Sequence, residues 1–246
     1  NLLHFHLVSV QPMTCPNEFM GFTRFKYETN SEKIHEIVTA KTRKLKCRPS
    51  TCLSMESEYL DIISKELINE LNAELLVDLW NNGATVGTWT VKPEDFTFEN
   101  MFCKKAEIHN VVGRKSLNQY NRHIVVGRSF YEEHKDVIRS RHDVDVTPNL
   151  VRCSGTDIHI VDNFWKDGML FIHRYDGFEG SGYVYSPYVF IGTTPITGEW
   201  VNNPNVCYSV GFLTRYGKRL CTLGANNFAR LEIKLENLVD NPKESN

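Results

Sequence analysis

The stretch MESEYLDIISKELINELNAELLVDLWN, residues 55–81 of this 246-residue chain, decides the fold. Ser54 is placed to cap its first turn, and Gly83 follows as a stop signal. At about 1.5 Å per residue such a helix measures ~40 Å, so we predict a rod in an elongated, flattened molecule. The prediction rests on apolar residues at steps of three and four, the period of a helix that buries one side: Leu60, Ile63, Leu67, Leu71, Leu75 and Leu79.

Acidic residues crowd the same helix. Between 55 and 81 there are seven Asp and Glu residues against the single Lys65. Like charges four residues apart destabilise an isolated helix by about 0.2–0.5 kcal/mol per pair, so such a row persists most easily where cations face it. The acidic row consists of Glu66, Glu70, Glu74 and Asp78.

The run KTRKLKCR at 41–48 is the candidate source of those cations. It holds Lys41, Arg43, Lys44, Lys46 and Arg48. If the run is a strand, Lys44, Lys46 and Arg48 share one face. This face could dock on the acidic row in the same subunit or in a neighbouring one, so the basic run and the acidic row together form a suspected subunit interface. The alternative is that the acidic row faces solvent.

Composition excludes several classes of protein. Hydrophobic residues make up 41% and charged residues 24%, which excludes a disordered chain. The balance of 28 Lys+Arg against 30 Asp+Glu, a net charge of −2, excludes a globally basic nucleic-acid wrapper. No apolar run approaches the ~20 residues of a membrane helix, so we expect no membrane partner.

The chain's thiols and its start fit a cytosolic origin. The residues 1–13 lack the basic segment of a secretion signal. The seven cysteines are odd in number and lack a CxxC pair, so we expect reduced thiols made in a cytosol. Because Asn1 is not a methionine, we expect that a protease removed the preceding residues or that they are missing from this sequence.

The remaining elements are mixed in order, which predicts an α+β fold rather than a regular βαβ repeat. We expect a basic strand at 41–48 and a hairpin around Lys166-Asp167-Gly168, whose two strands would cover 157–164 and 169–175. For a helix at 104–119 we expect Ala106 to point inward with its apolar neighbours. Further strands are expected at 22–27, 88–98, 122–127, 182–190, 207–213 and 228–235, and a further helix at 130–139.

Catalytic motifs are missing from the sequence, so we predict no catalytic residues, no cofactor and no metal site. Two alternatives stay open. A cytosolic metal-dependent hydrolase could use His142, Asp143 and Asp145, because imidazole and carboxylate groups hold divalent metals. A nucleic-acid-binding module could use the run at 41–48, whose lysines and arginines would contact phosphates without regard to base sequence.

Eight segments, in order along the chain, resemble the major capsid protein of T-even-type tailed phages. The first two, VQPM and AKTRKLK, are similar to the family's GVQPM and AKSRKLK, and GFLTRYG is close to its GFKTRYG. The resemblance is carried by residues 10–13, 40–46, 62–80, 121–128, 157–175, 182–188, 211–217 and 227–235.

This resemblance implies the HK97-like capsid fold, with a long spine helix, a P-domain sheet and an axial A-domain. It divides the chain into an N-terminal arm with a reduced extended loop (1–54), the P-domain spine helix and a strand (55–103), the A-domain (104–182), and P-domain return strands with a tail (183–246). The resemblance also implies trimming by a prohead protease.

The function so implied is that of a non-enzymatic structural protein of the virion. It would self-assemble, in the host bacterial cytoplasm, into hexamers and pentamers of an icosahedral head around double-stranded DNA. The expected partners are other copies of the chain, with vertex, cement or scaffold proteins besides. Packaged DNA would be contacted non-specifically if at all.

Overall fold

The computed structural model describes residues 2–25, 31–47, 57–92, 95, 97, 100, 103–104, 106–108, 110, 112, 122–139, 145–153, 156–162, 164, 167–174, 181–193, 210–222 and 224–235. It divides into two compact units. The first comprises Asn1–Val77 and Asp176–Gly224, and the second Asp78–Tyr175 and Ala225–Asn246. These boundaries differ from those of the four predicted segments, whose roles stay a prediction.

The first unit is built on a four-stranded sheet with the order β1-β11-β12-β4. Its strands are β1 (Ser9–Val10), β11 (Tyr183–Thr193), β12 (Val210–Leu220) and β4 (Lys41–Cys47). β1 runs parallel to β11, and the other two pairings are antiparallel. A short helix α1 (His4–Leu7) precedes β1. The predicted strand at 41–48 is confirmed as β4.

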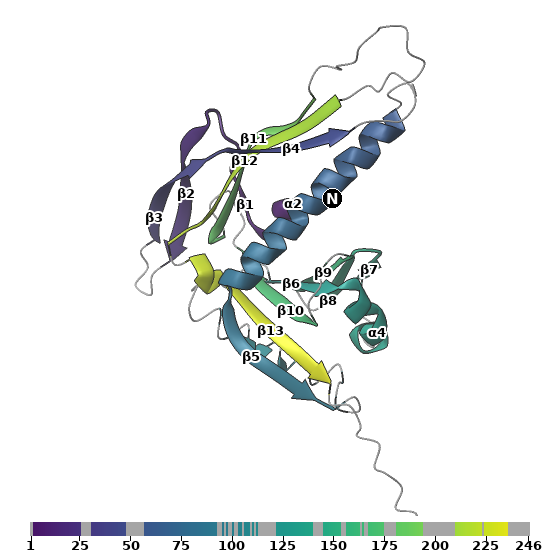
Figure 1. Ribbon diagram of the computed structural model, residues 1–246. Coiled ribbons are helices and arrows are strands. Elements are labelled where there is room, and N and C mark those ends of the chain that lie inside the picture. Colours follow the sequence, from purple (N-terminus) through teal and green to yellow (C-terminus); the bar gives the residue numbers. More distant parts are fainter. Residues whose placement is uncertain are drawn as a thin grey trace, which may run out of the picture. The chain divides into compact units, whose positions relative to one another are not determined.

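The long predicted helix is confirmed as α2 (Ser57–Asn82), a continuous helix in Figure 1. It ends where the backbone N–H of Gly83 bonds to the carbonyl of Leu79 at 2.9 Å. Ser54 and the side chain of Leu60 lie outside the described residues. The other apolar positions of the predicted stripe are all buried, namely Ile63, Leu67, Leu71, Leu75 and Leu79.

A two-stranded hairpin, β2 (Asn17–Phe25) with β3 (Ser31–Thr39), packs on the same sheet. Met20 and Val38 point inward and join a buried cluster with Met13 and Val184. At Gly217 of β12 the two layers come very close, because an added Cβ would lie 2.2 Å from Val38 Cγ1 and 3.2 Å from the carbonyl oxygen of Thr39. Glycine at this position therefore lets the hairpin seat on the sheet.

The polar side chains of Glu36 and Gln11 hold this hairpin in place through hydrogen bonds. Arg219 Nε of β12 lies 2.6 Å from Glu36 Oε2 of β3, and Glu36 also accepts bonds from the backbone and hydroxyl of Thr222. Near the N-terminus the side-chain amide of Gln11 bonds to both the N–H and the carbonyl of Gly21, at 3.0 and 2.6 Å. The amide thus pairs with β2 as a neighbouring strand would.

The second unit holds a seven-stranded mixed sheet with the order β5-β13-β10-β6-β9-β8-β7 (Figure 1). Its strands are β5 (Ala84–Val91), β13 (Phe228–Leu235), β10 (Gly168–His173), β6 (Arg122–Gly127), β9 (Thr156–Val161), β8 (Leu150–Cys153) and β7 (Asp145–Thr147). Its apolar core gathers Ile124, Val126, Ile158 and Phe171 with Tyr131 of α4 (Arg128–Arg139). A 3-10 turn, η2 (Gly224–Asn227), leads into β13.

Most predicted elements are confirmed, and two local predictions are wrong. β9 and β10 do not form a hairpin, because β6 lies between them, parallel to β9 and antiparallel to β10. All three strands are mostly buried, so a local turn signal could not select the neighbour. Ala106 is exposed, whereas Ile108 and Val112 are buried among the described residues of that segment. Among the described helices, none is long and apolar enough to cross a membrane.

The close approach at Gly217 predicts a strong effect of one methyl group. Gly217→Ala should lower the free energy of unfolding by about 1–3 kcal/mol, because the buried Val38 and a backbone carbonyl must both move. Urea denaturation of the full chain measures the loss. Gly192→Ala is the matched control, since its Cβ would meet only ordinary contacts at 3.4 Å or more in the same sheet. Equal denaturation midpoints for the two variants would contradict this account of the hairpin.

Candidate functional site

Charges of both signs meet between α2 and the four-stranded sheet. Lys218 Nζ of β12 lies 2.6 Å from Glu74 Oε1. Arg43 Nη1 of β4 lies 3.4 Å from Glu70 Oε2 and 3.9 Å from Glu74 Oε2. The hydroxyl of Tyr216 also donates to Glu74. The prediction that the basic run faces the acidic row is confirmed at Arg43, within one chain.

The register of β4 decides which of its cations reaches the helix. Arg43 is paired with Thr214 of β12, whose side chain is fully buried, and so shares the face that α2 covers. Lys44 is paired with Leu213, so it points to the opposite face and is exposed. The choice of Lys44 for a contact with the acidic row within the chain is therefore wrong. The side chain of Lys46 and all of Arg48 lie outside the described residues.

Glu74 is held as an anion at this junction. Its side chain is 27% exposed, and burial alone would raise the pKa. Hydrogen bonds from Lys218 and Tyr216, with the charges of Lys218 and Arg43, outweigh burial and lower the pKa of Glu74 below its usual value. The charges thus fix the helix on the sheet, where an unpaired carboxylate would destabilise the unit.

A buried histidine lies beside this junction. The ring of His4 packs on Tyr185 with the ring centroids 4.1 Å apart, and His4 is 3% exposed. Burial lowers the pKa of His4 to about 3, with Glu74 acting against that shift and Lys218 adding to it. The imidazole is therefore neutral in the folded protein throughout the physiological pH range. Burial, together with the nearby charge of Glu74, raises the pKa of Tyr185.

The other suspected interface residues differ in exposure. Lys41, Lys44 and Glu66 are exposed, whereas Glu70 and Asp78 are half-buried. Exposed charges of both signs remain available to a second copy. A role of the nine residues in contacts between subunits stays a prediction.

An exposed apolar pair on the hairpin was not predicted. Phe19 of β2 and Ile37 of β3 are cross-strand partners, and they are 67% and 55% exposed. The opposite face of the hairpin carries Met20, Glu36 and Val38 toward the sheet. The signal was present in the sequence, since apolar residues occupy both alternating faces of 17–25 and 31–39, which is unusual for a hairpin with one covered face.

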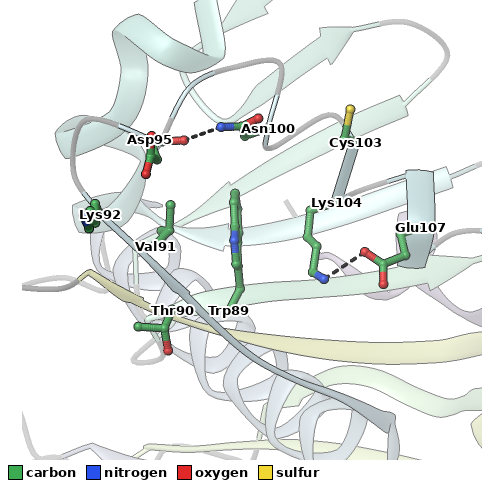
Figure 2. A pocket seen from close by; sticks show the side chains of 9 residues that line it. All are labelled: Trp89, Thr90, Val91, Lys92, Asp95, Asn100, Cys103, Lys104 and Glu107. Carbon is green, nitrogen blue, oxygen red and sulfur yellow. Dashed lines mark hydrogen bonds and ion pairs between the residues drawn. The ribbon is translucent and has the colours of Figure 1, made fainter.

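One cavity of about 510 Å³ lies within the second unit (Figure 2). Two of its four charged lining residues form an ion pair, with Lys104 Nζ 2.8 Å from Glu107 Oε2. The side-chain amide of Asn100 donates to the backbone carbonyl of Asp95. None of its nine lining residues is a histidine, and its carboxylates are those of Asp95 and Glu107. The lining residues are Trp89, Thr90, Val91, Lys92, Asp95, Asn100, Cys103, Lys104 and Glu107.

The alternative metal ligands are only partly described. Asp145 is exposed in β7. His142 and Asp143 lie outside the described residues, so this predicted group stays untested.

Comparison with solved structures identifies the fold. The capsid of the Cyanophage P-SCSP1u has a TM-score of 0.59 at 8% identity, over 93% of this chain and 86% of that one. For the Microbacterium phage Oxtober96 the TM-score is 0.60 at 10% identity, with 94% and 90% covered. The capsid of an empty GTA particle gives 0.60 at 11% identity, with 94% and 89% covered. The chain therefore has the α+β, HK97-like fold of phage capsid proteins.

Sequence comparison adds nothing to this likeness. No family model matches the chain, and no curated protein matches it either.

The buried imidazole predicts a pH-dependent stability. With a folded-state pKa of about 3 against an ordinary value of 6.5, His4 takes up a proton only on unfolding, so stability is complete above pH 6.5 and falls as the pH drops toward 3. His4→Phe keeps a ring on Tyr185 and removes this titration. Between pH 6 and 4 the free energy of unfolding should therefore fall less steeply in the variant. The two slopes should differ by about 1.4 kcal/mol per pH unit where the imidazole of the unfolded chain is fully protonated.

Urea denaturation at several pH values measures the two slopes. Groups that do not interact with His4, such as His134, contribute equally to both proteins and cancel in the difference. Parallel curves for wild type and His4→Phe would contradict the assignment.

Proposed function

We propose that this chain is the major capsid protein of a tailed phage, a structural subunit that self-assembles into the hexamers and pentamers of an icosahedral head around double-stranded DNA. The observation that carries the proposal is the fold. The likeness extends over 93–94% of this chain and 86–90% of three capsid chains, so it is not confined to a common local motif.

The finer identity proposed is the T-even type. The support is the order of the eight resembling segments between residues 10 and 235. The proposal includes a place in the virion and assembly in the host cytoplasm. It also includes contacts with vertex, cement or scaffold proteins, and with packaged DNA only through non-specific contacts.

We propose that the hairpin and the charged surface carry the contacts between copies. Phe19 and Ile37 form an apolar pair on the outer face of the β2–β3 hairpin, in the segment assigned to a reduced extended loop. The exposed Lys41 and Lys44 and the exposed Glu66 supply opposite charges. Such contacts are individually modest, but closed symmetry repeats them around every capsomer.

The alternatives have weaker support. The chain is not globally basic, so a nucleic-acid module would rest on the basic run alone, and one of its cations, Arg43, is already paired with Glu70. A metal-dependent hydrolase would need His142, Asp143 and Asp145 to lie together, and of these only Asp145 is among the described residues.

Electron microscopy tests the proposed function directly. Purified protein, with a scaffold partner if one is required, should form closed particles visible in negative stain, with no need for divalent metal. A chain that stays monomeric at high concentration under all such conditions would contradict the proposal. Loss of a hydrolytic activity in Asp143→Ala would favour the hydrolase, and steeply salt-dependent DNA binding by a monomer would favour the nucleic-acid module.

The hairpin pair makes the contact proposal specific. The double variant Phe19→Ser, Ile37→Ser should raise the protein concentration at which particles form by at least about tenfold. This change corresponds to a loss of ~1.4 kcal/mol of association free energy per subunit. Light scattering against concentration measures this threshold. Phe190→Ser is the matched control, because Phe190 is also an exposed aromatic residue, at 44%, but lies on β11. A normal threshold in the double variant would exclude these residues from the contacts.

A further inference from the structure

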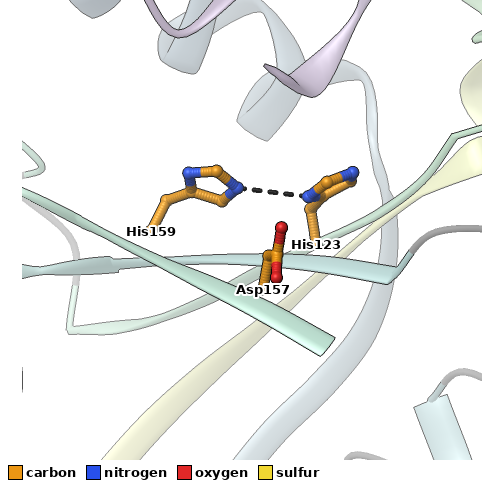
Figure 3. A group of neighbouring side chains, drawn as sticks. All are labelled: His123, Asp157 and His159. Atoms are coloured by element: carbon orange, nitrogen blue, oxygen red, sulfur yellow. Dashed lines mark hydrogen bonds between the residues drawn. The ribbon is translucent and has the colours of Figure 1, made fainter. Parts of the chain in front are cut away.

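Three side chains with metal-binding atoms meet in the second unit, on one face of the seven-stranded sheet (Figure 3). They are His123 of β6 and Asp157 and His159 of β9. One ligand atom from each lies within 4.8 Å of the others. The two histidines are 8% and 5% exposed, and Asp157 is partly buried.

Strand pairing brings these residues together. In the parallel ladder of β6 with β9, His123 is the direct partner of Asp157, and His159 follows two residues later. Alternate residues of a strand point to the same face, so all three side chains share one surface. The neighbouring residues Ile124, Ile158 and Ile160 point to the other face and belong to the apolar core. The group is thus held by two central strands rather than by loops.

The separation of the two imidazole nitrogens is close to that expected in a metal centre. His123 Nδ1 lies 3.1 Å from His159 Nε2. Two nitrogens bound to one tetrahedral Zn²⁺ at about 2.0–2.1 Å would be separated by ~3.3 Å. Without metal, one of the two facing nitrogens donates its hydrogen to the other, whereas with metal both would bind the ion through their lone pairs. Metal binding would remove that hydrogen and turn the rings until both lone pairs point at the ion, with little change in the distance between the two nitrogens.

We propose that His123, Asp157 and His159 bind one divalent transition-metal ion, Zn²⁺, that joins β6 to β9. Two imidazoles and one carboxylate form a known zinc ligand set, which water completes at the fourth position. The proposal is independent of the assembly function.

The surroundings of Asp157 provide the entry route. Its side chain is 33% exposed, so an ion can reach the histidines from the carboxylate side. Arg152 of β8 lies with its Nε 3.4 Å from Asp157 Oδ1, and its own side chain is 62% exposed. Arg152 compensates the carboxylate without metal, and its exposure lets it turn toward solvent when a cation arrives. Metal binding would then release Arg152 and fix Asp157.

The sequence did not lead to this site, because His123 lies 34 residues before Asp157 and 36 residues before His159. Asp157-Ile158-His159 is visible as a pair of ligands on one strand face. Nothing in the sequence places His123 beside it, since that requires the parallel pairing of β6 with β9.

The full chain, freed of metal with a chelator and kept reduced, is titrated with Co²⁺ and then with Zn²⁺. Wild type should bind one equivalent of Co²⁺ with the visible absorption bands of a tetrahedral site, and Zn²⁺ should displace it. With free Zn²⁺ about 100-fold above the dissociation constant, the unfolding temperature should rise by about 5–10 °C.

Variants separate the three ligands from other binding groups. Asp157→Asn should weaken Co²⁺ affinity at least tenfold, and His159→Gln should abolish the tetrahedral bands. His173→Gln is the matched control, because His173 is another buried histidine of the same sheet, on β10, and should leave the affinity unchanged. If His159→Gln fails to fold, Asp157→Asn still decides, since Asp157 is partly exposed and asparagine has the same shape.

Three results would overturn the site: no saturable binding by wild type, unchanged affinity in Asp157→Asn, or bands of thiolate–cobalt charge transfer that reveal cysteine ligands. Because the readouts are metal affinity and unfolding temperature, they do not depend on particle formation. A chain that binds the metal but forms no shell would contradict only the proposed function.

Discussion

The carboxylate of Glu74 restricts how the long helix can lie on the four-stranded sheet. Its partners Lys218 and Tyr216 come from β12, and Arg43 comes from β4. All three must lie on the same face of the sheet. Because successive residues of a strand point to opposite faces, this condition restricts the β4–β12 register to steps of two residues. A slip by one residue would turn Arg43 away from Glu74 and weaken the pairing of a partly buried anion. The charge cluster therefore specifies register, while the apolar residues of α2 supply the burial.

The opposite face of this sheet carries a different kind of contact. Gly217 permits the β2–β3 hairpin to approach, and Glu36 fixes it through Arg219. The hairpin then has one covered face and one outer face with Phe19 and Ile37. The proposed contacts between copies would use this outer face.

The fold is shared with capsid proteins at 8–11% identity, which shows how little of it depends on particular residues. What the chains share is the spatial arrangement of the backbone over most of their length. The segments that resembled T-even-type capsid proteins fall on helices and strands of this backbone. Residues 40–46 lead into and form β4, 62–80 lie in α2, and 227–235 contain β13.

The sequence by itself determined the elements whose signal is local. The three- and four-residue period identified α2, and the apolar runs at 122–127 and 228–235 matched β6 and β13, because period and side-chain type act over neighbouring residues. The tertiary structure alone decided that β6 separates β9 from β10, that Arg43 rather than Lys44 meets the acidic row, and that His123 lies beside His159. Each of these depends on the pairing of strands far apart in the chain, and that pairing is set by the burial of whole sheets, which no local pattern encodes.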